Sequence, residues 1–427
     1  MAQEDARRPG EVSRAGADTL ACLERAFAAA RAYLAGLPDR PVARVPSLDA
    51  LRKSLGGPMP DSPLDPAVVV DDLVRQADPG LVSTAGPRYF GFVTGGALPA
   101  ATAADWLAAV WDQPASLYVL SPAAAVVEEA AGRWLIDLLG LPPGASAGFV
   151  TGCHMANFTA LATARLEVLR RAGWDLAENG LSGAPPIRVI VGGEVHVSVM
   201  GALRMLGIGA RQVEPAASDA EGRMKPEALE RLLDGGTAAP TIVCAQSGNV
   251  NSGAFDPLDR IAPIARRHGA WLHVDGAFGL WASASAALRH HMRGVELADS
   301  WATDAHKWLN VPYDSGLVFT AHPAAHRAAM GLSAAYLVRS GDEPRENMDW
   351  TPEASRRARG FAVYAALRSL GRSGVEALVD RCCRLAKLFA ARLASDPRID
   401  ILNEVVLNQV LVRAVPRGAD ADEATRA

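Results

Sequence analysis

The chain has 427 residues, of which 49% are apolar and 21% charged, and its formal net charge at pH 7 is −4. This is the balance of an ordinary globular protein, and the length exceeds that of a single hydrophobic core, so we expect two or three packed domains. A weak negative charge with both signs interspersed gives no reason to expect binding to nucleic acid or to an anionic membrane.

The N-terminal part is predicted to be helical and then extended. Residues 1–14 are polar and charged without an apolar core, so we expect no secretory signal. Apolar residues recur at helical spacing over 18–37, and the Pro- and Gly-rich stretch 41–66 indicates an extended connection. Charged residues interrupt the Ala-rich stretches that follow, so no run is long enough to cross a bilayer.

Short apolar runs alternate with helical patterns in the middle of the chain. Strands are predicted at 149–151, 188–191, 212–214, 241–245, 271–274, 300–303 and 317–320. This alternation is typical of a mostly parallel sheet with helices on both faces. Ligands of such sheets bind beyond the carboxyl ends of the strands, so polar residues there are candidates for a functional site.

The last hundred residues predict a smaller α+β domain. Helical patterns over 354–370 and 375–393 precede two short strands at 399–402 and 406–413. Two strands alone make a weak sheet, so we expect the natural domain to continue or the chain to be cut short. The expected divisions are an N-terminal helical segment (1–80), a large domain (81–325) and a small C-terminal domain (326–427). Five scattered cysteines without metal-type spacing favour a reducing compartment.

Two predicted strands end on groups that suit an anion and a cation. After the first strand, Gly152, Cys153 and His154 open a helix, where backbone N–H groups can converge on an anion. A plain capped turn is the alternative explanation. The fifth strand ends on Asp275, whose carboxylate needs a cation or several donors if it is buried, and a protonated pyridine nitrogen would suit it. A structural capping carboxylate is equally compatible.

Two further strand ends carry Lys307 and His196. Lys307 follows the sixth strand among Trp301, Trp308 and Leu309, and loss of hydration would lower its pKa and free the amine to attack a carbonyl. A solvated lysine is the usual alternative. His196 could stack on a flat cofactor and move a proton, although a lone histidine is more often a core residue. All four features fall on one sheet edge, which favours a ligand site.

The order of His196, Asp275 and the pair His306-Lys307 resembles the group II decarboxylases that depend on pyridoxal phosphate (PLP). This family includes the aromatic amino-acid and glutamate decarboxylases, and the likeness runs from about Pro87 to Arg413. It implies the aspartate aminotransferase-like fold type I, with a large PLP-binding domain and a small α+β domain. It also implies a cytoplasmic homodimer, formed through the N-terminal segment, with active sites at the interface.

By this resemblance, Lys307 would hold PLP as a Schiff base and Asp275 would hold the pyridinium proton. His196 would stack on the cofactor ring and take part in catalysis. Further cofactor contacts would come from Gly152, Cys153, His154, Asn249, Ala277 and His306. The substrate pocket would include Phe92, Thr94 and Trp111. No metal site is expected.

The reaction expected from the resemblance is decarboxylation of an aromatic or acidic L-amino acid. Aromatic decarboxylases of the family deliver a proton to Cα from a loop tyrosine, but the matching stretch 341–350 has no Tyr. Asn347 stands nearest the expected position, and Tyr336 comes earlier. His196 or a water would then protonate Cα. Aldehyde synthesis, C–C cleavage of the aldolase type and transamination at the same site remain alternatives, and the substrate is not determined by the sequence.

Two other classes of protein deserve comparison. Residues 144–148 match the G-x-S-x-G pattern of serine hydrolases around Ser146, but a strand follows the pattern where the nucleophile elbow requires one before it. The sequence contains no H-E-x-x-H and no cysteine pair at zinc spacing. A non-catalytic binding protein would need no lysine buried at a strand end.

Overall fold

The structure is a computed structural model that describes residues 14–42, 46–236, 239–332 and 345–414. Its contacts divide the chain into two units, residues 1–96 and 97–427. The helices of the first unit's described part are α1 (Arg14–Gly36), α2 (Leu48–Leu55) and α3 (Pro66–Ala77), followed by a short 3-10 turn (Asp78–Gly80). Within this unit α1 and α3 pack against each other.

Helix α2 lies inside the stretch predicted to be extended, and that prediction was wrong. Ser47 begins the helix, because its hydroxyl accepts a hydrogen bond from the backbone N–H of Ala50 at 3.3 Å. Asp65 caps α3 in the same way, accepting from the N–H of Ala67 at 2.8 Å. Local capping thus produces helices between the prolines and glycines of this region.

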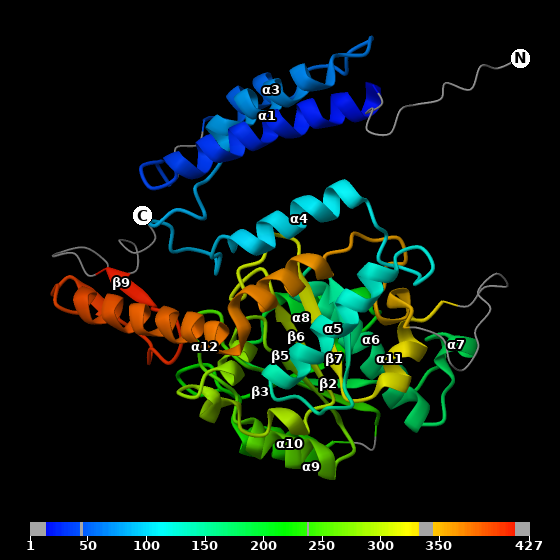
Figure 1. Cartoon of the computed structure of the whole chain (residues 1–427). Coiled ribbons are helices and arrows are strands. Elements are labelled where there is room, and N and C mark those ends of the chain that lie inside the picture. The colour runs from blue at the N-terminus through cyan, green and yellow to red at the C-terminus, as the bar shows by residue number, and fades with distance from the viewer. Residues whose placement is uncertain (1–13, 43–45, 237–238, 333–344, 415–427) are drawn as a thin grey trace, which may run out of the picture. The chain divides into compact units, whose positions relative to one another are not determined.

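The second unit is built on a seven-stranded sheet, which Figure 1 shows at its centre. In chain order its strands are β1 (Ser146–Val150), β2 (Arg188–Gly192), β3 (Val213–Ala216), β4 (Thr241–Gln246), β5 (Trp271–Asp275), β6 (Ser300–Asp304) and β7 (Gly316–Thr320). Their spatial order is β1-β7-β6-β5-β4-β2-β3, and only β7 runs antiparallel to its neighbours. The predicted mostly parallel sheet is therefore confirmed, with all seven strands near their expected positions.

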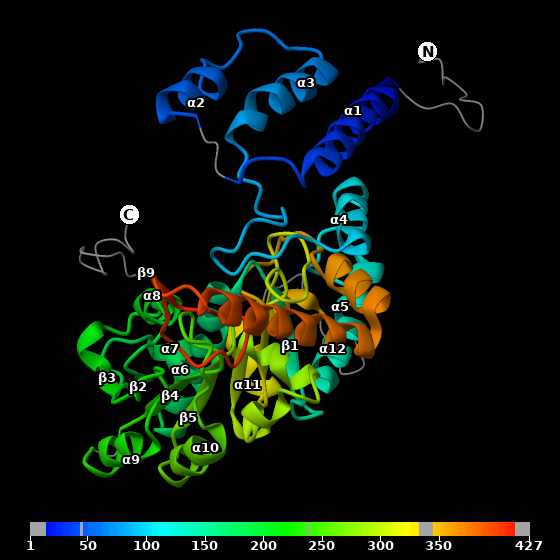
Figure 2. The same cartoon turned by 90° about the vertical axis from the view of Figure 1, so that its left-hand side faces the viewer.

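Helices cover both faces of this sheet (Figures 1 and 2). The helices of the second unit are α4 (Pro99–Trp111), α5 (Pro122–Leu138), α6 (Cys153–Arg171), α7 (Leu176–Asn179), α8 (Val197–Met205), α9 (Pro226–Asp234), α10 (Leu258–Arg267), α11 (Pro323–Met330) and α12 (Gly360–Leu393). Helices α8 and α11 both pack against α6, while α9 and α10 pack together on the opposite face. Across the described ranges, no helix is long and apolar enough to span a membrane.

The C-terminal elements follow the predicted pattern with one difference. The expected break between two helices is present within α12 at Gly371, where the non-helical φ of 61° and ψ of 179° separate two helical segments. Strands β8 (Ile399–Ile401) and β9 (Val412–Ala414) pair antiparallel, but the second strand begins later than predicted.

The core of the second unit is centred on the sheet. Every residue of β1, β5, β6 and β7 is buried, as expected for strands covered on both faces. Trp271, Trp281 and Trp301 are completely buried and carry much of the apolar area. The parallel register places Asp275 opposite Gln246 and Ala302, so β4, β5 and β6 end at one edge.

Candidate active site

The N-terminus of α6 lies at the carboxyl end of β1. An α-helix leaves the N–H groups of its first turn without acceptors inside the helix. Here the backbone N–H of Cys153 donates to Asp304 Oδ1 at 2.6 Å, which joins this helix end to the end of β6. Gly316 on β7 passes so close that a Cβ atom there would lie 2.4 Å from the carbonyl carbon of Gly152. Only glycine at position 316 permits this approach.

Lys307 follows β6 directly and forms an ion pair with Asp304. Its Nζ lies 2.9 Å from Asp304 Oδ2, with the lysine side chain 20% exposed and the aspartate side chain 4%. The Phe278 ring centroid is 5.9 Å from the same Nζ. Burial by itself lowers the pKa of Lys307, but the charge of Asp304 and its hydrogen bond to the lysine, with a smaller contribution from the charge of Asp275, outweigh it, and the pKa is raised. The expectation of a lowered lysine pKa was therefore wrong for the protein without a cofactor.

His306 is held in place by the loop that leads to β7. Its Nδ1 accepts the backbone N–H of Ser315 at 3.1 Å, so the proton of the neutral ring sits on Nε2, 3.4 Å from Asp304 Oδ1. The Tyr313 ring stacks on the imidazole at 4.3 Å, and burial lowers the pKa of His306. The Ser315 hydroxyl is buried and has no hydrogen-bond partner within the described residues. An unpaired hydroxyl beside a helix N-terminus suits a phosphate.

Asp275 is 4% exposed and is surrounded by neutral donors in the described part of the chain. Its Oδ1 accepts the backbone N–H of Ala277 at 3.2 Å and the thiol of Cys153 at 3.5 Å, and its Oδ2 accepts the Asn157 amide at 3.2 Å. Burial, followed by the charges of Asp275 and Asp304, raises the pKa of Cys153 well above its ordinary value, so the thiol stays protonated. A buried carboxylate with neutral donors is suited to bind a cation.

A chain of hydrogen bonds connects Asp275 to His196. The Asn157 amide that donates to Asp275 also lies 3.2 Å from Ser198 Oγ. Ser198 Oγ is 2.8 Å from His196 Nδ1, and the Ser198 backbone N–H donates to the same nitrogen at 3.3 Å. Because Nδ1 is an acceptor, the neutral imidazole of His196 carries its proton on Nε2.

His273 orients the Asn157 amide. Its Nε2 lies 2.9 Å from Asn157 Oδ1, and its Nδ1 lies 3.0 Å from Ser300 Oγ, which also accepts from Trp271 Nε1 at 2.9 Å. Burial lowers the pKa of His273 to about 4, so the ring stays neutral and donates from Nε2. The amide oxygen therefore faces His273, and the amide nitrogen faces Asp275.

The structure brings together the central residues of the predicted site. Contacts from Asp304 and Asp275 join Lys307, His306, Cys153 and Ala277, and the Asn157–Ser198 link extends to His196. Asp304, Asn157, Ser198 and His273 had not been predicted to belong to the site. Asp304 could have been identified from its place three residues before the lysine, whereas the other three have no distinctive sequence signal.

Other predicted residues have separate surroundings. Asn249 Oδ1 accepts the N–H groups of Asn251 and Ser252 within its own turn. The His154 side chain is exposed and lies against Gly201 of α8. Their roles at the cofactor stay predictions.

The predicted pocket residues lie in both units. Trp111 is 47% exposed and contacts Phe361 edge-on at 5.1 Å in the second unit. Phe92 and Thr94 belong to the first unit. Tyr336 and residues 341–344 lie outside the described residues, while Asn347 is 1% exposed in a 3-10 turn, Asn347–Trp350.

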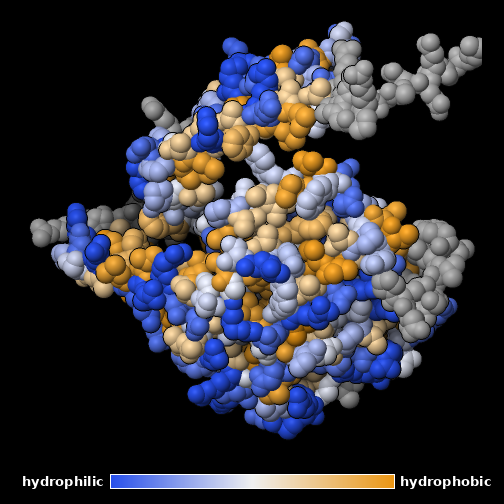
Figure 3. All heavy atoms as spheres, viewed as in Figure 1, coloured by the Kyte–Doolittle hydropathy of each residue, from blue (hydrophilic) through white to orange (hydrophobic). Residues whose placement is uncertain are grey.

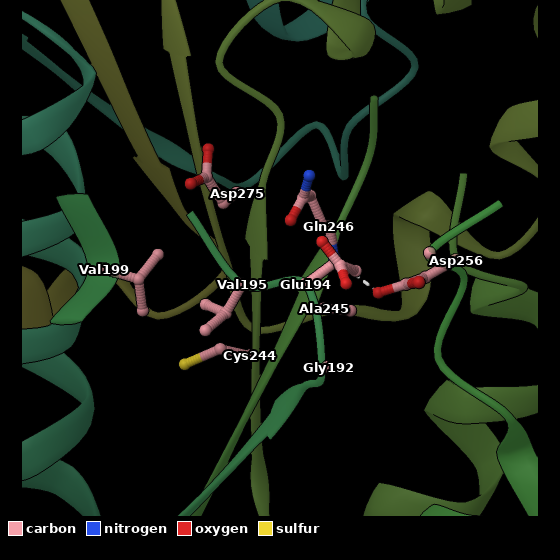
Figure 4. A pocket seen from close by; sticks show the side chains of 10 residues that line it. Gly192, Glu194, Val195, Val199, Cys244, Ala245, Gln246, Asp256 and Asp275 are labelled. Atoms are coloured by element: carbon pink, nitrogen blue, oxygen red, sulfur yellow. Dashed lines mark hydrogen bonds between the residues drawn. The ribbon is translucent and has the colours of Figure 1, made fainter. Parts of the chain in front are cut away.

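A small cavity lies beside Asp275 at the carboxyl ends of β2, β4 and β5, as Figure 4 shows. Its lining residues are Gly192, Glu194, Val195, Val199, Gly222, Cys244, Ala245, Gln246, Asp256 and Asp275. The cavity is at the edge where doubly wound sheets bind their ligands.

Ser146 does form a hydrogen bond with a histidine, but not at an accessible site. Its Oγ is 2.9 Å from His326 Nδ1, and His326 Nε2 is 3.0 Å from the carbonyl oxygen of Trp350. Ser146 is 5% exposed and His326 is completely buried, with its pKa lowered to about 3 by burial. The pair connects β1 to α11 inside the core, which is incompatible with hydrolysis of an external substrate.

A lysine and a buried carboxylate at neighbouring strand ends of a mostly parallel sheet are the groups that a pyridoxal-phosphate site of fold type I requires. The family model described as the pyridoxal-dependent decarboxylase conserved domain matches residues 49–415. The chain therefore belongs to the pyridoxal-dependent decarboxylase family, which confirms the predicted family and cofactor.

Curated relatives of this chain have several activities. The acidic amino acid decarboxylase GADL1 of Mus musculus is 31% identical over 344 residues, 78% of this chain and 61% of that protein. Tryptophan decarboxylase 1 of Oryza sativa subsp. japonica is 28% identical over 407 residues, 88% of this chain and 77% of that protein. Phenylacetaldehyde synthase of Arabidopsis thaliana is 26% identical over 398 residues, which cover 90% of this chain and 80% of that protein. The chain spans less than two thirds of the first of these relatives.

A solved structure confirms the fold. A crystal structure of Oryza sativa TDC with PLP and tryptamine superposes with a TM-score of 0.89, covering 98% of this chain and 89% of that chain at 24% identity. The predicted fold type I architecture is thus correct.

The residues of the strand edge fit PLP. Lys307 offers an amine for its aldehyde, and Asp275 offers a carboxylate without a cationic partner among its contacts in the described residues. The first turn of α6 and the unpaired Ser315 hydroxyl offer donors for its phosphate.

Proposed function

We propose that this chain is a PLP-dependent decarboxylase of an L-amino acid that binds its cofactor covalently through Lys307. The observation that carries the proposal is the continuous set of contacts from Lys307 through Asp304, Cys153 and Asp275 toward His196. Membership of the family supplies the reaction type. The same edge of the sheet therefore holds a lysine, a carboxylate and an imidazole.

When bound, PLP supplies an electron sink for the electrons of the bond that breaks at Cα. Asp275 would keep a proton on the ring nitrogen, and Asn157 and Ala277 hold that carboxylate in position. The first-turn N–H groups of α6, with the side chains of His306 and Ser315, would hold the phosphate.

His196 would pack on the cofactor ring and return a proton to Cα from Nε2. Its Nδ1 is occupied by Ser198, so Nε2 is the nitrogen that carries the transferable proton. This assignment compensates for the absence of a tyrosine in 341–350.

The substrate class is proposed to be acidic or aromatic L-amino acids. Relatives named for acidic amino acids and for tryptophan support this range. Phe92, Thr94 and Trp111 are proposed to line the substrate pocket, and Asn249 and His154 to complete the cofactor site.

Aldehyde formation is the second candidate function. Two observations favour it: the stretch 341–350 lacks a tyrosine, and a phenylacetaldehyde synthase is among the relatives. In this reaction the amino acid, one dioxygen and one water are consumed, and an aldehyde, carbon dioxide, ammonia and hydrogen peroxide form, with dioxygen as the oxidant that is reduced to the peroxide.

We also propose a homodimer with active sites at its interface, in the cytoplasm. Large apolar side chains are exposed on α1 and α3, including Phe27 at 59%, Leu34 at 62% and Leu73 at 59%, and on α4, including Val110 at 53%. Figure 3 shows apolar surface over these helices. Such faces are typical of protein interfaces.

All five cysteines are unpaired, which fits a reducing compartment. The divisions at 80 and 325 remain our proposed domain boundaries.

The test is to incubate the PLP-loaded protein with single L-amino acids and to measure carbon dioxide, amine, aldehyde and ammonia separately. Equal amounts of carbon dioxide and amine support decarboxylation, and carbon dioxide with aldehyde and ammonia identifies the second function. Aldehyde and glycine without carbon dioxide would contradict both proposed functions. Transfer of the amino group to a keto acid, without release of ammonia or carbon dioxide, would contradict them as well. Lys307→Ala should lose the cofactor fixed by borohydride at this site, and retention of that label would refute the central role of Lys307.

A further inference from the structure

Asp304 occupies the position between the lysine and the N-terminus of α6. The residue is 2% exposed. Its Oδ2 is 2.9 Å from Lys307 Nζ, and its Oδ1 is 2.6 Å from the backbone nitrogen of Cys153 and 3.4 Å from His306 Nε2. One buried carboxylate thus contacts the amine that binds the cofactor and the helix end that binds its phosphate.

Both contacts oppose cofactor binding. The ion pair with Asp304 stabilises Lys307 as an ammonium ion, and an ammonium ion has no lone pair with which to attack an aldehyde. The hydrogen bond from Cys153 uses the first N–H group of α6, and a second anion at that helix end would be repelled by the carboxylate.

We propose that Asp304 is a positioning residue that controls cofactor loading, because in the cofactor-free protein it keeps Lys307 charged and occupies the phosphate end of the site. Loading then requires Lys307 to release one proton to solvent. The neutral amine adds to the aldehyde carbon, the C=N bond forms, and one water molecule leaves. This inference rests on the proposed role of Lys307 but does not depend on which bond of the substrate is later broken.

The other charged or titratable groups around Lys307 do not replace Asp304. Cys153 from α6 stays a thiol, since burial and the neighbouring carboxylates raise its pKa well above the ordinary value. Asp275 from β5 acts on the lysine only through its charge, without a hydrogen bond. The pKa of His306 is lowered by burial, so that ring stays neutral. Asp304 is therefore the carboxylate whose removal should change the charge state of Lys307.

The experiment is rapid mixing of the cofactor-free protein with PLP, following the visible absorbance of the Lys307-bound cofactor from pH 6 to 9.5. Asp304→Asn keeps the shape and an acceptor for the Cys153 N–H but removes the charge. Asp299→Asn is the matched control, because Asp299 lies just before β6, accepts the backbone N–H of Leu272 at 2.7 Å and pairs with His322 at 2.7 Å. The ratio of variant to wild-type rates cancels the titration of PLP itself.

For Asp304→Asn we expect loading at pH 7.5 to be about tenfold faster or more, because each unit of lowered lysine pKa raises the free amine fraction tenfold. Its rate should also level off at a lower pH than that of the wild type, while Asp299→Asn follows the wild type. The substitution should accelerate the loading of pyridoxal, which lacks the phosphate, less than the loading of PLP. Rates for Asp304→Asn within twofold of wild type at every pH, or slower, would overturn the inference.

Wild-type protein provides a second test that does not depend on the folding of a variant. Its loading rate, divided by that of Nα-acetyllysine with PLP, should stay constant up to pH 9.5, because an ion-paired lysine remains charged over this range. A ratio that falls by about tenfold per pH unit above about pH 8 would show an amine that is already free and would contradict the inference. Absence of any lysine-bound cofactor would instead refute the proposed function.

Discussion

Replacing Asn157 with alanine should strongly destabilise the second unit. The amide donates to the carboxylate of Asp275 at 3.2 Å and lies 2.9 Å from His273 Nε2, and all three side chains are buried. Loss of a hydrogen bond to a charged group costs about 1.5–3 kcal/mol, and a buried donor left without a partner costs about 1–3 kcal/mol. We therefore expect a loss of about 3–5 kcal/mol in the free energy of unfolding, since the two costs fall on different groups.

Urea unfolding followed by tryptophan fluorescence measures this loss. All nine tryptophans lie between positions 106 and 350, so the signal reports on the second unit. Thr163→Ala is the matched control on the same buried helix, because its hydroxyl donates to the Thr159 carbonyl at 3.0 Å and loss of this hydrogen bond should cost about 1 kcal/mol. A destabilisation by Asn157→Ala no larger than that of the control would refute the idea that the amide supports both groups.

Three further changes have defined outcomes. Gly316→Ala would place a Cβ 2.4 Å from the Gly152 backbone, so we expect PLP affinity, measured by fluorescence titration, to fall by about tenfold or more; unchanged affinity would show that the helix end adapts easily. Arg356→Met leaves Glu128 buried without its cation at 2.7 Å and should cost about 3–5 kcal/mol in urea unfolding, whereas a loss below 1 kcal/mol would contradict this. The pKa of His326 is lowered by burial to about 3, below its unfolded value, so its stabilisation is complete above pH 6.5 and falls by about 1.4 kcal/mol per pH unit as the pH drops toward 3. His326→Asn should flatten unfolding free energy against pH between 6.5 and 4, and an unchanged slope would count against the buried neutral ring.

Several features of the site were predictable because they depend on local sequence. The alternation of apolar strands and helices predicted the parallel sheet, and the rule that ligands bind at carboxyl ends of strands placed Asp275, His196 and Lys307 on one edge. The resemblance carried by His306-Lys307 then indicated the cofactor. Helix α2 was missed, since its start depends on a single capping serine within a Pro- and Gly-rich stretch.

The charge state of Lys307 was not predictable in the same way. Apolar neighbours in the sequence suggested a lysine with a lowered pKa, but the fold places Asp304 2.9 Å from its nitrogen and raises that pKa. Burial and a nearby opposite charge act in opposite directions on a lysine, and only distances in space decide which effect prevails.

The sequence by itself determined the order of the strands along the chain, the identity of the lysine and the carboxylate, and the family. Only the tertiary structure decided which groups support them. Asn157 on α6, Ser198 on α8 and His273 on β5 are far apart in the sequence, and their hydrogen bonds exist because helix and sheet pack face to face. Such contacts are set by three-dimensional packing, in which a buried polar group must find its partner, and no local pattern of residues records where that partner will be.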